Sequence, residues 1–136
     1  MTEENRRDNI AEEIERAEAA RRAAELLSQS GLFSDAVSRL YYFLFHWVRA
    51  LLLTEGLEPR THEGMLRMLA QRFVKKGAVA KEVAHTVSRL MKYREEADYN
   101  PSYVFAEDDY WRLREETVTA VSAIKQYVEK KGYGKK

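Results

Sequence analysis

The stretch GLFSDAVSRLYYFLFHWVRALL, residues 31–52, decides the fold of this chain. Val37, Leu40 and Leu44 recur within it every three or four positions, which is the period of one face of an α-helix. Further aromatic side chains at positions 42, 43, 45 and 47 extend the apolar surface around most of that helix. Because a helix that is apolar on nearly all sides must be surrounded by other elements, we expect a helix over about 33–55 at the centre of a bundle.

Four further segments show the same helical period and are separated by glycine or proline. The chain has only six glycines and two prolines, which are too few to punctuate many strands. The pattern therefore predicts five helices, over about 3–29, 33–55, 62–76, 79–98 and 107–131. Thr61 is placed to cap the third. Short connections favour antiparallel neighbours, so we expect an all-α fold, an up-and-down helical bundle of four to five helices.

The length of 136 residues is enough for one domain, which buries about two thirds of the surface of the unfolded chain. We expect a single domain over 1–136, with its core over about 10–131 and a frayed tail at 132–136. The absence of cysteine excludes disulfides, thiolate nucleophiles and zinc sites built on cysteine. Neither a membrane span nor a signal peptide is recognisable, so we expect a cytoplasmic protein.

Charge is distributed unevenly although the whole chain has a net charge of +1. Residues 58–94 hold nine basic and three acidic side chains, whereas residues 95–122 hold two basic and eight acidic ones. The basic block is suited to collecting phosphates. It is equally explained as the solvated backs of two helices that acidic neighbours balance. The near-neutral total is unlike that of a dedicated nucleic-acid binder.

One charged pair lies on the apolar stripe of the fourth predicted helix. Continuing the stripe from Leu90 and Met91 by its own period reaches Arg94 and then Asp98, so both side chains are expected to point inward. Burying a guanidinium is unfavourable unless it is paired or meets an anion. The pair therefore either ties the end of this helix to the second helix or to a second subunit, or Arg94 presents a bidentate donor to a phosphate while Asp98 holds it in place. Both roles can hold together.

Four blocks in order carry a family resemblance: GLFSDAVSRLYYFLFH at 31–46, THEG at 61–64, RFVKKG at 72–77 and REEADY at 94–99. Together they resemble the HEPN superfamily, most closely the small stand-alone prokaryotic branch often encoded beside a minimal nucleotidyltransferase. The resemblance implies a helical bundle, a homodimer and a toxin–antitoxin-like module with that nucleotidyltransferase as partner. It also implies RNA or a nucleotide as the ligand.

Active members of that family are metal-independent ribonucleases in which an Arg is followed, after four to six residues, by a His across a dimer cleft. Arg94 matches the family Arg, but Tyr99, Asn100 and Pro101 occupy the positions where the His would stand. A tyrosine with a pKa of about 10 is a poor base at neutral pH. The resemblance thus implies a site that binds an anion or a partner at Arg94, Asp98 and Tyr99 without the usual catalysis.

Two alternatives remain at this point. In one, the protein still cleaves RNA, with Tyr99 or His62 replacing the missing family His. In the other, it is a structural interaction module with no ligand, and the pair of Arg94 and Asp98 only fixes packing. In some family pairs the partner nucleotidyltransferase attaches nucleotides to a tyrosine near the motif, which the resemblance would assign to Tyr99. Tyr99 and Tyr103 are expected to be at least partly exposed.

The remaining polar candidates lie on other helices. His46 is expected to be a hydrogen-bonded core histidine, His62 to cap its helix or reach the cleft, and His85 to face solvent. Arg39 and Tyr42 form a polar edge of the second helix, either through packing or as part of the same groove as Arg94. No metal is expected, because the chain lacks H-E-x-x-H or comparable spacing. No cofactor is expected, because Walker and dinucleotide fingerprints are also missing.

Overall fold

The computed structural model describes residues 1–100, 102 and 105–134, and within them the chain is all-helical, as predicted. It contains α1 (Glu3–Gln29), α2 (Phe33–Leu53), α3 (His62–Leu69), α4 (Lys81–Tyr99) and α5 (Glu107–Lys130). A π-helical segment, η1 (Ala70–Val74), continues α3. The expected bundle of helices is thus confirmed, and most helix ends fall within two residues of the expected positions.

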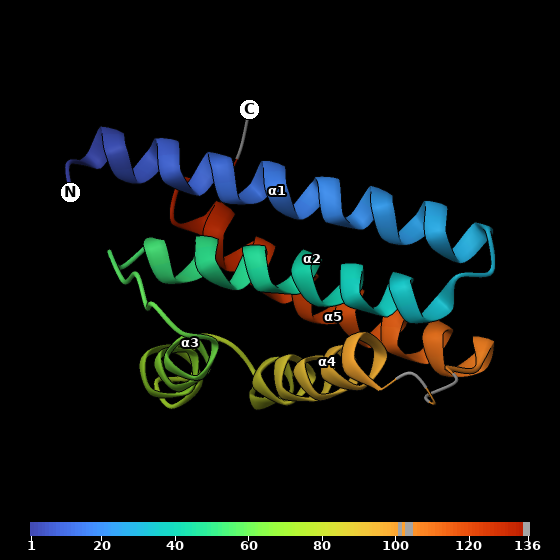
Figure 1. The fold of residues 1–136 in the computed structure, drawn as a ribbon. Coiled ribbons are helices and arrows are strands. Elements are labelled where there is room, and N and C mark those ends of the chain that lie inside the picture. The colour runs from blue at the N-terminus through green and yellow to red at the C-terminus, as the bar shows by residue number, and fades with distance from the viewer. Residues whose placement is uncertain (101, 103–104, 135–136) are drawn as a thin grey trace.

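The central position predicted for α2 is confirmed. In Figure 1, α1 and α2 run side by side in opposite directions, and α2 also packs against α4 and α5. Its apolar side chains are buried on several sides: Val37, Tyr41, Leu44, Leu51 and Leu52 are each at most 1% exposed. The aromatic residues that the sequence places around this helix therefore contact neighbours on more than one face.

The local start and stop signals act as the sequence indicates. Thr2 caps α1 by accepting a hydrogen bond from the backbone N–H of Asn5 at 3.0 Å, and Thr61 caps α3 by accepting one from Gly64 at 2.8 Å. The third helix does not continue as an α-helix to residue 76 but changes to the π-helical η1, where the backbone N–H of Lys75 bonds to the carbonyl of Ala70 at 2.8 Å. This widened turn keeps Phe73 fully buried.

The expected frayed tail at 132–136 is wrong for residues 132–134. Tyr133 is only 7% exposed, and its hydroxyl donates a hydrogen bond to Oε1 of Glu3 at 2.6 Å. Arg7 lies over the Tyr133 ring at 4.8 Å and donates to the carbonyl of Gly132 at 2.9 Å. The chain end is therefore docked on α1, because an aromatic ring there gains apolar contact and a hydrogen bond. Positions 135 and 136 lie outside the described residues.

Candidate functional site

Arg94 points inward from the last turns of α4, where the helical period places it. Its side chain is only 14% exposed, and Nη1 lies 3.3 Å from Oδ2 of Asp98. The guanidinium carbon lies 5.2 Å from the centre of the Tyr41 ring and 5.8 Å from that of Tyr42, both on α2. Arg94 is therefore held between α4 and the aromatic face of α2.

Asp98 is fixed in turn by α2. Its Oδ1 accepts a hydrogen bond from the hydroxyl of Ser38 at 2.7 Å. Ser38 is buried, and its role was not anticipated, although its position beside the inward-facing Val37 could have suggested it. The contacts from Ser38 to Asp98 and on to Arg94 link the C-terminal end of α4 to α2, so the predicted structural role of the pair is present.

This link leaves part of the Arg94 guanidinium free. Its buried Nε has no hydrogen-bond partner among the described residues. Burial alone would lower the pKa of Arg94, but Tyr42, Tyr99, Tyr41 and Asp98 outweigh burial and raise that pKa above its ordinary value. The side chain is thus a permanent cation with hydrogen-bonding capacity to spare.

A pocket of about 400 Å³, which we call the Arg94 pocket, opens beside this guanidinium. It is lined by Arg94, Glu95, Glu96, Tyr99 and Asn100. Tyr99 is 74% exposed, and the amide of Asn100 donates to Glu96 at 3.1 Å. The two carboxylates reduce the positive potential that Arg94 produces there. Pro101 and Tyr103 lie outside the described residues.

His62 lies closer to Arg94 than sequence spacing could show. Its Nδ1 is 2.8 Å from the hydroxyl of Tyr41, the same ring over which Arg94 packs. Burial lowers the pKa of His62, and the positive charge of Arg94 lowers it further, so the imidazole is neutral at pH 7. Burial raises the pKa of Tyr41, which stays protonated. Tyr41, which joins them, was not among the predicted site residues.

Neither Arg39 nor Tyr42 lines the Arg94 pocket. The Arg39 guanidinium lies 5.9 Å from the centre of the Tyr42 ring, but both residues line a different hollow of about 330 Å³ between α1 and α2. This α1–α2 groove is lined by Arg16, Ala19, Ala20, Ala23, Arg39, Tyr42 and His46. Tyr42 also contacts Arg94, which lies 5.8 Å from its ring centre.

His46 is a hydrogen-bonded histidine, as predicted, but it also lines the α1–α2 groove. Its Nδ1 lies 2.7 Å from Oε1 of Glu13 on α1. Glu13 was not among the candidates, although its spacing from Ile10 and Ala17 places it on the inward stripe of α1. A charged residue on an apolar stripe was the signal that could have identified it.

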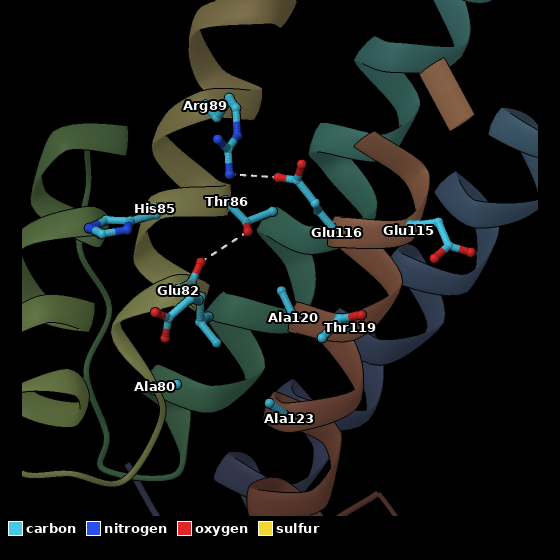
Figure 2. A pocket seen from close by; sticks show the side chains of 11 residues that line it. Ala80, Glu82, His85, Thr86, Arg89, Glu115, Glu116, Thr119, Ala120 and Ala123 are labelled. Carbon is cyan, nitrogen blue, oxygen red and sulfur yellow. Dashed lines mark hydrogen bonds and ion pairs between the residues drawn. The ribbon is translucent and has the colours of Figure 1, made fainter. Parts of the chain in front are cut away.

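A further groove of about 520 Å³ lies between α4 and α5 (Figure 2). Small side chains such as Thr86, Ala120 and Ala123 line it, and Arg89 and Glu116 form an ion pair of 2.6 Å across it. His85, which is exposed, is the one predicted candidate histidine in its wall. Arg94 is not part of this groove.

Neither a metal cluster nor a membrane-spanning helix is found in the described residues. Across residues 1–100, 102 and 105–134, no group of three or more potential ligands is arranged to hold a metal ion. In the same part of the chain, none of the helices combines the length and hydrophobicity that crossing a membrane needs.

Comparison with known proteins relates this chain to a family. Residues 10–131 match the family model described as HEPN domain. The Methanocaldococcus jannaschii protein named "Putative toxin MJ0142" is 33% identical over 115 residues, which cover 85% of this chain and 78% of that protein. A second protein of that organism, "Putative toxin MJ0605", is 38% identical over 68% of this chain and 69% of its own. A Thermotoga maritima UPF0332 protein is 36% identical over a region that covers 74% of this chain and 79% of that protein.

Proposed function

The chain belongs to the HEPN family, and from that premise we propose that it is the HEPN component of a toxin–antitoxin-like module. In this role it binds a phosphate-bearing ligand, RNA or a nucleotide, at the Arg94 pocket. Two relatives carry the word toxin in their names, which supports the setting of the module. The partner would be a separately encoded minimal nucleotidyltransferase.

The observation that carries this proposal is the state of the Arg94 side chain. The guanidinium is held by Asp98, Tyr41 and Tyr42, and Arg94 also lines the Arg94 pocket. A guanidinium held in place loses less conformational entropy on binding than a free one. A phosphate oxygen would satisfy the remaining donors with charge-assisted hydrogen bonds.

A second copy of the chain would complete the site. Glu95 and Glu96 weaken the field of a single Arg94 in the pocket. In a homodimer that brings two Arg94 pockets together, the second guanidinium would offset these carboxylates. The exposed ring of Tyr99 at the same place would then gain contacts. Such a dimer follows the arrangement that the family resemblance implies.

Binding of a short single-stranded RNA to the wild type and to Arg94→Gln tests the proposal. Arg67→Gln is the matched control, because Arg67 is exposed and belongs to the same basic block without lining the Arg94 pocket. We expect Arg94→Gln to weaken binding about tenfold or more, and the control to change it about twofold. Equal losses in both variants would indicate nonspecific attraction and refute a site at Arg94.

A ribonuclease activity is the second candidate function, and the position of His62 favours it. His62 is neutral at pH 7 and lies next to Tyr41, over which Arg94 packs. A neutral imidazole near a guanidinium is the pair of groups that 2′-OH attack on a phosphodiester requires. Cleavage of RNA in the presence of a chelator, lost in both Arg94→Gln and His62→Gln, would establish this activity. If the RNA stays intact, ligand binding without cleavage would remain as the function of this site.

The ligand-free interaction module is tested by the same variants. The contacts from Ser38 through Asp98 to Arg94 would then serve only to join α2 and α4. This function would be supported if the wild type bound neither RNA nor ATP at low salt and Arg94→Gln lost stability. Light scattering at micromolar protein concentration tests separately whether the protein is a dimer.

A further inference from the structure

A buried carboxylate organises the polar side of the α1–α2 groove. Glu13 is 7% exposed and lies between two groups of α2: Nδ1 of His46 at 2.7 Å from Oε1, and Nε of Arg49 at 3.0 Å from Oε2. Burial alone would raise the pKa of Glu13, but the hydrogen bonds from His46 and Arg49 outweigh it and hold that pKa below its ordinary value. Glu13 is therefore ionised at neutral pH, and Arg49 balances its charge.

This arrangement fixes the tautomer and orientation of His46. A carboxylate can only accept a hydrogen bond, so the proton between the two groups resides on Nδ1 of His46. Glu13 therefore makes no hydrogen bond to the other ring nitrogen, Nε2. Because His46 also lines the α1–α2 groove, the held imidazole contributes a polar edge to it.

Two guanidinium groups lie in the wall of the same groove. Arg39 forms no ion pair within residues 1–100, 102 and 105–134, and its one cation–π contact is with Tyr42. Arg16 pairs with Glu12 at 2.6 Å, but both side chains are 58% exposed, and exposed pairs of this kind contribute little. Both arginines can therefore turn toward an anion without losing a strong partner.

The α1 side of the groove leaves room for a ligand. It contributes Ala19, Ala20 and Ala23, whose short side chains do not fill the space. The volume of about 330 Å³ is at the lower end of the range of small-molecule sites. Guanidinium groups are the donors from which phosphate oxygens accept most strongly, and Nε2 of His46 can accept a hydrogen bond from a protonated phosphate oxygen.

We propose that the α1–α2 groove is a second anion site, separate from the Arg94 pocket, in which Arg16, Arg39 and His46 bind one phosphate group. Glu13 is a positioning residue, because it holds the imidazole without facing the ligand. The site does not depend on the proposed function of Arg94, since the two hollows share no lining residue.

The test is a titration with inorganic phosphate, AMP and adenosine, followed by the ¹⁵N resonances of the His46 imidazole. We expect phosphate and AMP to shift these resonances and adenosine to leave them unchanged. Arg39→Gln should weaken binding about tenfold or more, since a hydrogen bond to a charged group is lost. Ala19→Leu should also abolish binding by filling the groove, because residue 19 is exposed and leucine is a good helix former.

Two control variants separate this site from its surroundings. Arg22→Gln removes an exposed charge of α1 outside the groove and should leave the affinity for AMP within about twofold. Arg94→Gln should do the same, even if it abolishes the binding of RNA. Wild-type affinity in both Arg39→Gln and Ala19→Leu would overturn the proposal, as would equal binding of adenosine.

Discussion

The hydroxyl of Ser38 on α2 lies 2.7 Å from Oδ1 of Asp98 on α4, and this hydrogen bond joins two helices whose residues are 60 positions apart. The other carboxylate oxygen of Asp98 faces Arg94 at 3.3 Å. The orientation of the guanidinium thus depends on a serine of the central helix. A fold in which α4 shifted along α2 would lose the contact between Ser38 and Asp98, whereas Arg94 and Asp98 would stay together on α4.

Replacing Ser38 by alanine tests this link. We expect Ser38→Ala to lower the free energy of unfolding by about 1 kcal/mol, because a buried hydrogen bond to a partly exposed carboxylate is lost. Urea denaturation monitored by circular dichroism measures the change. Ser88→Ala on the exposed side of α4 is the control, with an expected change below about 0.5 kcal/mol. Equal values for the two variants would contradict the role of Ser38.

The pH dependence of the free energy of unfolding should reveal the protonation of His62. Its pKa is lower in the folded protein than the ordinary value of 6.5, first through burial and then through Arg94. The unfolded chain therefore binds the proton more readily, and the stability present above about pH 6.5 is lost as the pH falls through the folded pKa. In His62→Gln this part of the pH dependence should be missing. A profile of the same shape in both proteins would show that His62 does not titrate in this way.

Removal of the Glu13 carboxylate should destabilise the packing of α1 on α2. In Glu13→Ala, His46 and Arg49 both lose a partner, and we expect a loss of about 2 kcal/mol in the free energy of unfolding. Glu12→Ala removes an exposed carboxylate one residue away and should cost less than about 1 kcal/mol.

Glu13 also predicts a second pH window. Because its folded pKa is depressed, its contribution is present above the ordinary value of 4.5 and is lost as the pH falls through the folded pKa. Thermal melts between pH 3 and pH 6 would follow this loss, which Glu13→Gln should abolish. A wild-type melting temperature independent of pH in that range would be inconsistent with an ionised Glu13.

Truncation of two tyrosines should change stability to very different extents. Tyr133→Ala removes a ring that is 7% exposed and bonded to Glu3, and we expect a loss of about 3 kcal/mol. Tyr99→Ala removes a ring that is 74% exposed in the monomer and should change stability by less than about 0.5 kcal/mol. The melting temperatures of the two variants are compared by thermal unfolding at low protein concentration. Similar melting temperatures would mean that the chain end is not docked on α1.

Periodicity and local signals in the sequence determined much of the fold. They indicate five helices, the cap at Thr61 and the central place of α2, because each depends only on residues within a few positions of one another. The same local argument predicted that Arg94 and Asp98 share the inward stripe of α4. The docking of Tyr133 was missed, because nothing near position 133 indicates contact with Glu3 at the other end of the chain.

The tertiary structure alone decided which of these inward-facing groups meet. It joins Ser38 to Asp98, places Tyr41 between Arg94 and His62, and assigns Arg39 to the α1–α2 groove. A helical period determines the face on which a side chain lies, but contacts between helices also depend on their crossing angles and axial offsets. Those offsets are set by the packing of the whole core, so no short stretch of sequence contains them.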